Sequence, residues 1–162
     1  MNRLSSIGPV KAVSLAVATG FGSGFLPVSG TWGTLVALVL HRFLFPEAFT
    51  ADRWLSGILI LGIVSCIAIA TAETADRHYG TKDDSRITVD EIAGYFVAVY
   101  ALPAGWGPAL SAFVVFRIMD IVKLPPAYRL QELPGGVGIV IDDLIAGLYS
   151  CLIVHAMYRW LL

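Results

Sequence analysis

The chain has 162 residues, of which 57% are hydrophobic and only 14% are charged, and its formal net charge is −1. This length suits one domain, and so low a charged fraction excludes an ordinary soluble protein, in which about a quarter of the residues are charged. The near-zero net charge argues against a nucleic-acid partner, and two cysteines in apolar runs, Cys66 and Cys151, argue against a disulfide framework. The composition therefore predicts a single membrane-embedded domain that covers residues 1–162.

Two apolar segments in the first half of the chain predict a helical hairpin. Residues 33–45 form the shorter segment, and the longer one, residues 54–72, contains no charged side chain. At about 1.5 Å per residue the longer segment covers about 28 Å, close to the thickness of a hydrocarbon core. Pro46 and the polar run 50–53 separate the two segments, so a turn is expected there.

The second half of the chain predicts another hairpin and a last helix. The most polar stretch, residues 73–91, precedes apolar segments at 92–102 and 109–119, which the run PAGWGP separates. A loop rich in proline and glycine at 120–137 then leads to a helix from about Gly138 to Leu162.

The distribution of basic residues predicts the orientation of these hairpins. If both form, the N-terminal segment and the two polar loops face one side, which carries eight of the eleven basic residues and is therefore cytoplasmic. A rival topology makes residues 92–119 one kinked span, which would split the basic residues between the two faces. Charge disfavours it, and we predict an all-α, polytopic integral membrane helical bundle with short helices and polar cytoplasmic loops.

Acidic residues converge at the cytoplasmic face of this topology. The acids concerned are Asp83, Asp90, Glu91, Asp120, Asp142 and Asp143. We expect Asp142 and Asp143 in the first turn of the last helix, where acids also complement the helix dipole without any catalytic role. Arg117, Asp120 and Lys123 are spaced three residues apart and share one helix face if the helix extends that far. Carboxylates suit Mg²⁺ and basic side chains suit phosphate, so the pattern favours a metal-dependent site for a phosphorylated substrate.

Glycines accompany the acids at two places. Gly136 and Gly138 could present backbone N–H groups to a phosphate at a helix N-terminus, although a simple turn explains them better when they are taken alone. Gly94 and Gly147 each follow an acidic pair by four residues, and small residues in membrane helices mark close packing. Such packing would bring the two acidic pairs together.

These glycines, and all of the acids except Asp83, fall within four longer blocks, which are GFGSGFLPVSGTWGTL (20–35), TVDEIAGY (88–95), FRIMDIVK (116–123) and GGVGIVIDDLIAG (135–147). In order and spacing these blocks closely resemble the phosphatidylglycerophosphatase A family. The resemblance implies an all-helical enzyme of the bacterial inner membrane, with its active site facing the cytoplasm. The implied reaction is the Mg²⁺-dependent removal of the terminal phosphate of phosphatidylglycerophosphate, a phospholipid, to give phosphatidylglycerol.

The same resemblance implies a set of site residues. Asp90, Glu91, Asp142 and Asp143 would ligate the metal, with Asp83 and the catalytic Asp120 next, while Arg117 and Lys123 would bind phosphate. Two positions depart from the family pattern, because Ser29 and Leu124 stand where prolines are usual. Both changes affect loop shape more than chemistry.

Two other functions remain open from the residues alone. Acids within membrane segments are common in transporters and ion pathways, and ion pairs can also assemble a noncatalytic membrane subunit. Transport is disfavoured because the acids gather at one face and the longest span is uncharged. A noncatalytic subunit is disfavoured because neither acidic pair has a basic residue in its own segment. The sequence does not decide between a water nucleophile and a carboxylate nucleophile, for which Asp90 and Asp142 are the candidates, and it leaves the oligomeric state open.

Overall fold

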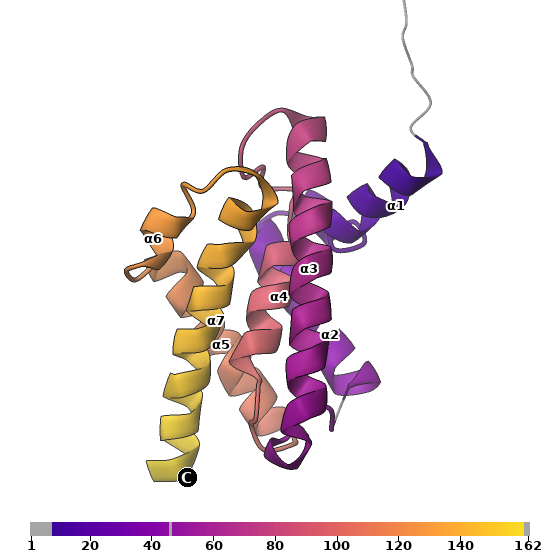
Figure 1. Cartoon of the computed structure of the whole chain (residues 1–162). Coiled ribbons are helices and arrows are strands. Elements are labelled where there is room, and N and C mark those ends of the chain that lie inside the picture. The colour runs from indigo at the N-terminus through magenta and orange to yellow at the C-terminus, as the bar shows by residue number, and fades with distance from the viewer. Residues whose placement is uncertain (1–7, 46, 161–162) are drawn as a thin grey trace, which may run out of the picture.

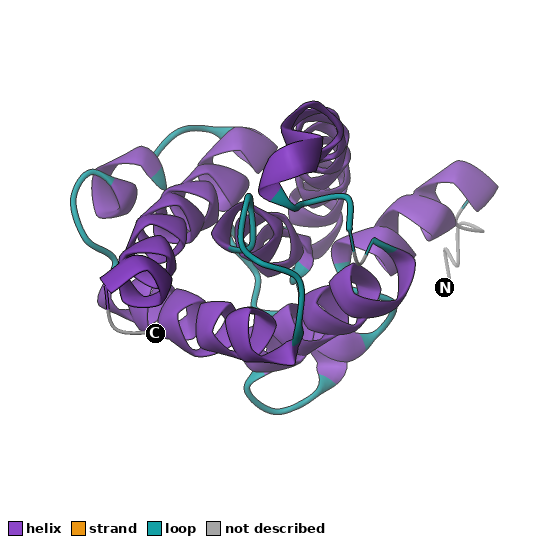
Figure 2. Ribbon diagram, turned by 90° about the horizontal axis from the view of Figure 1, so that it is seen from below, coloured by secondary structure: helices purple, strands orange, loops and turns teal. Residues whose placement is uncertain are grey.

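The structure, a computed structural model, describes residues 8–45 and 47–160. Arg3, which the sequence analysis assigns to the cytoplasmic side, lies outside these residues. Within them the chain forms helices and loops and no strand, which confirms the predicted all-α class (Figure 2). The helices are α1 (Pro9–Ala18), η1 (Ser23–Phe25), α2 (Ser29–Leu44), η2 (Ala51–Arg53), α3 (Trp54–Tyr79), α4 (Val89–Ala98), α5 (Trp106–Val122), α6 (Ala127–Leu130) and α7 (Gly135–Trp160).

Helix α4 lies at the centre of the bundle, and α2, α3, α5 and α7 all pack against it. Most of its side chains are therefore buried, including the fully enclosed Tyr95. The aromatic rings of Phe96 and Phe116 and several alanines complete the core around it. Any polar residue on α4 consequently needs a partner inside the bundle, which makes Asp90 and Glu91 conspicuous.

The order and directions of the helices agree with the two predicted hairpins, although α2 and α3 each pack against α4 and make little contact with each other. In Figure 1, α3 and α5 run toward the end of the bundle that carries the loops 80–88 and 123–134, whereas α4 and α7 run away from it. Helices α4 and α5 are separate and pack against each other, so the rival reading of 92–119 as one kinked span is wrong. The two polar loops and the first turns of α4 and α7 thus share one end.

Two helix boundaries differ from the prediction. Helix α3 continues through residues 73–79, where a polar loop was expected, and ends at Gly80, whose φ of 73° allows the left-handed helix cap. Helix α7 begins at Gly135 instead of Gly138. Asp142 and Asp143 therefore lie about two turns inside α7 and not in its first turn, so the dipole explanation does not apply to them.

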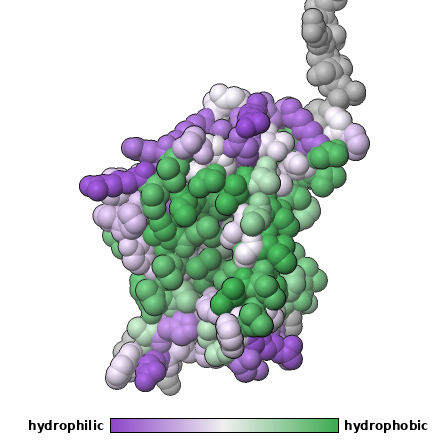
Figure 3. Space-filling model, in the orientation of Figure 1, coloured by the Kyte–Doolittle hydropathy of each residue, from purple (hydrophilic) through white to green (hydrophobic). Residues whose placement is uncertain are grey.

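The surface of the bundle is divided into bands. On the face seen in Figure 3, hydrophobic residues form a band across the middle, with hydrophilic residues above and below it. Two helical segments, Ala51–Tyr79 and Gly135–Trp160, are long and apolar enough to cross a membrane. Large apolar side chains such as Leu59 and Ile63 of α3 are exposed, as lipid contact would require. These features agree with a membrane protein; the number of crossings remains a prediction.

Candidate active site

Close contact between α4 and α7 brings the two acidic pairs together. A methyl group added at Gly94 would lie 2.6 Å from the backbone oxygen of Asp143, and one added at Gly147 would meet the backbone oxygen of Gly94. Only glycine at both positions allows the two backbones to approach so closely. The packing predicted from these glycines is confirmed, and it places one turn of each helix, with its acids, side by side.

Three carboxylates meet at this crossing. One oxygen from each of Asp90, Glu91 and Asp143 lies within 4.8 Å of the other two. Asp90 and Asp143 are only 7% and 4% exposed, and Asp90 Oδ1, Glu91 Oε2 and Asp143 Oδ2 are buried without a hydrogen-bond partner. Buried carboxylates this close together cannot all remain ionised unless a cation lies between them. An all-oxygen donor set of this kind fits a hard divalent cation.

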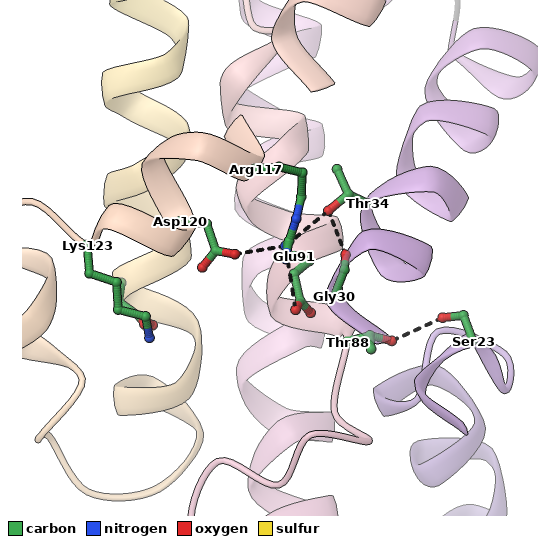
Figure 4. A network of polar contacts seen from close by, with 9 residues as sticks. Ser23, Gly30, Thr34, Thr88, Glu91, Arg117, Asp120 and Lys123 are labelled. Atoms are coloured by element: carbon green, nitrogen blue, oxygen red, sulfur yellow. Dashed lines mark hydrogen bonds and ion pairs between the residues drawn. The ribbon is translucent and has the colours of Figure 1, made fainter. Parts of the chain in front are cut away.

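Arg117 of α5 approaches the cluster from one side (Figure 4). Its Nη1 lies 2.8 Å from Asp120 Oδ2 and 3.8 Å from Glu91 Oε1. The first of these contacts confirms the predicted pairing of Arg117 with Asp120. The side chains of all three residues are largely buried, so their interactions are weakly screened by solvent. Asp120 thus orients the arginine, and the arginine partly neutralises Glu91.

Lys123 approaches from another side and does not pair with Asp120. Helix α5 ends at Val122, and Lys123 adopts a left-handed conformation with φ of 48°, which turns its side chain away from the helix face. Its Nζ donates to Asp142 Oδ2 at 2.7 Å and to Gln131 Oε1 at 3.0 Å. The helix does not extend as far as a shared face of Arg117, Asp120 and Lys123 requires, so only Arg117 and Asp120 pair. Partial burial opposes the charged form, but the Asp142 carboxylate outweighs it and raises the pKa of Lys123.

Asp142 is separated from the three-carboxylate cluster although it is adjacent to Asp143 in sequence. Successive residues of an α-helix point about 100° apart, so the two carboxylates face different surroundings. Asp142 is 4% exposed, and its Oδ1 is buried without a partner while its Oδ2 holds Lys123. Asp142 is thus a buried carboxylate beside the cluster, with one free oxygen.

Asp83 lies in the loop between α3 and α4, outside the three-carboxylate cluster. Its backbone N–H donates to Asp76 Oδ1 at 3.3 Å. Together with Gln131, the acceptor for Lys123, it lines an open pocket of about 220 Å³ at the polar end of the bundle. In the same loop, the hydrogen-bonded Arg86 guanidinium holds the pKa of Asp84 well below its usual range. The loop is thus held in place by its own charge pairs.

The glycines at the start of α7 pack against neighbouring groups. The N–H of Gly136 donates to Glu73 Oε2 at 2.6 Å, so this donor already has a carboxylate partner. A methyl group at Gly138 would collide with the backbone oxygen of Leu133. These contacts give both glycines a packing role, and neither lies in the three-carboxylate cluster.

The Gly-rich segment 20–35 lies against the site. The sequence assigned this segment no role in the chemistry. A methyl group at Gly30 would meet Glu91 and would lie 2.8 Å from Arg117 Nη2. Arg117 Nη1 also lies 3.5 Å from Thr34 Oγ1, and Ser23 Oγ lies 3.2 Å from Thr88 Oγ1 at the start of α4 (Figure 4). The density of glycines in the segment was the available signal, because glycine allows a backbone to approach this closely.

The fold and the site together define a helical protein with a candidate carboxylate metal centre at one end of its bundle, flanked by an arginine and a lysine. Residues 16–158 match the family model described as Phosphatidylglycerophosphatase A. The chain belongs to this family and is accordingly a phosphatase. This assignment gives no support to the transport alternative.

Relatives with this name are similar over most of their length. Phosphatidylglycerophosphatase A of Haemophilus influenzae is 35% identical over 162 residues, covering 95% of this chain and 97% of the relative. The Escherichia coli protein of the same name is 35% identical over 148 residues, covering 89% and 83%. A Bacteroides thetaiotaomicron protein, provisionally named phosphatidylinositol-3-phosphatase, is 36% identical over 153 residues, covering 90% and 93%. No solved structure matches the chain.

Proposed function

We propose that this enzyme hydrolyses the terminal phosphate of phosphatidylglycerophosphate to give phosphatidylglycerol, with Mg²⁺ as cofactor. Two relatives at 35% identity carry the name of this activity. The observation that carries the mechanism is the buried cluster of Asp90, Glu91 and Asp143, whose three partnerless oxygens call for a cation. Phosphate monoesters are dianionic near neutral pH, so a cation between three carboxylates also offsets the repulsion between site and substrate.

In this proposal Asp90, Glu91 and Asp143 hold the metal ion. Mg²⁺ is the preferred ion because carboxylate oxygens suit it and it commonly bridges a protein to substrate phosphates. When bound, the ion supplies positive charge to the phosphoryl oxygens as the ester bond breaks. Asp83 lies in the loop beside the site, outside this ligand group. We therefore propose three ligands from two helices.

The basic residues bind the phosphate. Arg117, held by Asp120, presents a planar guanidinium suited to two phosphoryl oxygens, and Lys123 supplies a second positive charge. Asp142, outside the metal group, accepts a proton from the attacking water through its free Oδ1. The water oxygen bonds to phosphorus, the ester P–O bond breaks, and the departing glycerol oxygen takes a proton from a solvent water. Asp142 then returns its proton to solvent.

The placement of the site suits a lipid substrate. The acids lie at the start of α4 and two turns into α7, near the end of the bundle that carries the polar loops (Figure 1), and the apolar band of Figure 3 begins below that end. A phospholipid whose headgroup reached the site could therefore keep its acyl chains along the band. We propose that α2 with α3 crosses the bacterial inner membrane as a hairpin, that α7 crosses it once, and that the shorter α4 enters it with α5 from the side of the two polar loops. By the positive-inside rule, the end that carries the two polar loops then faces the cytoplasm.

A substrate panel tests the function. Purified protein in detergent is given phosphatidylglycerophosphate, phosphatidylinositol 3-phosphate or phosphatidic acid, with Mg²⁺ or with a chelator, and released phosphate is measured. We expect release from phosphatidylglycerophosphate to be fastest and to require the metal. Faster release from phosphatidylinositol 3-phosphate would reassign the substrate in line with the Bacteroides relative. Undiminished release in the chelator would contradict the metal-dependent mechanism.

A further inference from the structure

Thr34 is a buried polar residue of the Gly-rich segment that the mechanism above does not use. It lies one turn into α2 and is fully buried, with 0% exposure. Its Oγ1 donates to the backbone oxygen of Gly30 at 2.8 Å, and it also lies 3.5 Å from Arg117 Nη1 (Figure 4). A hydroxyl has a single proton, which here is committed to Gly30. Toward Arg117, therefore, Thr34 can act only as an acceptor.

This acceptor completes the surroundings of one guanidinium nitrogen. Arg117 Nη1 faces Asp120 at 2.8 Å, Thr34 at 3.5 Å and Glu91 at 3.8 Å, which are contributed by three different helices. Arg117 Nε, by contrast, is buried without a partner. The guanidinium is thus fixed on one side and unsatisfied on another, as expected for a group that waits for an anion.

The glycines of the segment explain how Thr34 reaches this place. A methyl group at Gly33 would lie 2.7 Å from Thr88 Cβ, and one at Gly30 would collide with Glu91. Without side chains at these two positions, the first turns of α2 can lie directly against the start of α4. Thr34 is thereby brought between Gly30 and Arg117.

We propose that Thr34 is a positioning residue for Arg117, which its hydroxyl holds in the orientation that binds the substrate phosphate. The proposal rests on the proposed function, because it concerns how the same site recognises phosphate. It extends the site beyond the acidic helices to the N-terminal Gly-rich segment. Thr34 touches no substrate and acts only through Arg117.

The test compares three variants with the wild-type enzyme. Thr34→Val removes the hydroxyl and keeps the shape, whereas Thr34→Ser keeps the hydroxyl. Thr71→Val is the matched control, because Thr71 of α3 is also buried and donates to a backbone oxygen four residues earlier, but contacts no charged group. We expect Thr34→Val to raise KM and the inhibition constant of inorganic phosphate about tenfold each, with kcat within about twofold. Thr34→Ser and Thr71→Val should keep the wild-type values.

A second measurement separates positioning from folding. If Thr34→Val does not fold, Thr34→Ala replaces it, and each variant is also made together with Arg117→Lys, in which the effect of losing the hydroxyl should largely disappear. Equal KM values for Thr34→Val and Thr71→Val, or an undiminished effect beside Arg117→Lys, would overturn the proposal. A wild-type protein that releases no phosphate from any lipid would instead refute the proposed function.

Discussion

The contact between α4 and α7 can be opened with one methyl group. In Gly94→Ala the new Cβ would lie 2.6 Å from the Asp143 backbone oxygen and 2.6 Å from Phe116 Cε2, whereas real Cβ atoms essentially never come closer than 3.0 Å. The helices must therefore separate locally by at least about 0.4 Å. Overpacking of this kind costs about 1–3 kcal/mol, against a gain of up to about 1 kcal/mol in helix propensity.

The functional effect should exceed the loss of stability. The displaced groups are the backbone of Asp143, which is a proposed metal ligand, and the ring of Phe116, which directly precedes Arg117 in the chain. Because a misplacement of about 1 Å can cost about a hundredfold in rate, we expect kcat/KM to fall between tenfold and a hundredfold in Gly94→Ala. Higher Mg²⁺ should restore part of the loss if the metal group has been opened.

The assay measures phosphate release and the thermal midpoint in detergent at several Mg²⁺ concentrations. Gly62→Ala is the control, since a methyl group at Gly62 of α3 would meet nothing within 4 Å. The control should keep full activity and be as stable as the wild type or more so. If Gly94→Ala retained wild-type activity and metal dependence, the argument that this glycine contact assembles the site would be refuted.

Other consequences follow from individual side chains. Asp143→Asn should abolish turnover and weaken metal binding, yet raise the thermal midpoint in metal-free buffer because one buried like charge is removed; a lower midpoint there would contradict the repulsion argument. Asp142→Asn should also abolish turnover but leave metal binding intact, as checked by metal titration of the folded protein. Lys123→Met should chiefly raise KM, by about tenfold, because it removes a phosphate-binding charge; a loss confined to kcat would instead place Lys123 in transition-state stabilisation. Glu73→Gln should lower the thermal midpoint with little change in KM, because its partners are the N–H of Gly136 and the Arg77 side chain and not the substrate.

The convergence of the acidic pairs was predictable from the sequence for a specific reason. Gly94 follows Asp90 by four residues and Gly147 follows Asp143 by four, and this spacing places each glycine and that acid on one helix face. Once Gly94 and Gly147 pack together, the adjacent acids must meet. The positive-inside rule then favoured the arrangement in which both polar loops lie at one end, and the helix directions in the structure agree with it.

The errors came from helix ends and from treating adjacent acids as equivalent. Pro125 and Pro126 indicate that α5 ends near Lys123, but the sequence does not show that Lys123 itself adopts the left-handed conformation, which turns its side chain away from the expected face. The polar residues 73–79 remain helical because a helix can extend past an apolar core when its outer face is solvated. Asp142 and Asp143 could have been separated beforehand, since neighbours on a helix point in different directions.

The role of Thr34 could not be predicted from the sequence for a different reason. A threonine within an apolar helix is ordinarily explained by a bond to the backbone four residues earlier, and Thr34 makes that bond. Its second contact, to Arg117, joins positions 83 residues apart, which no local pattern reveals.

Direct measurement of metal binding tests the central claim, that carboxylates from α4 and α7 share one divalent cation. Mn²⁺ can replace Mg²⁺ in a titration followed by electron paramagnetic resonance, with Asp143→Asn as the test variant and Asp52→Asn, an exposed acid outside the cluster, as the control. We predict one tightly bound ion per chain in the wild type and in Asp52→Asn, and at least about a tenfold weaker affinity in Asp143→Asn. Equal affinity in all three proteins, or no bound ion in the wild type, would contradict the account.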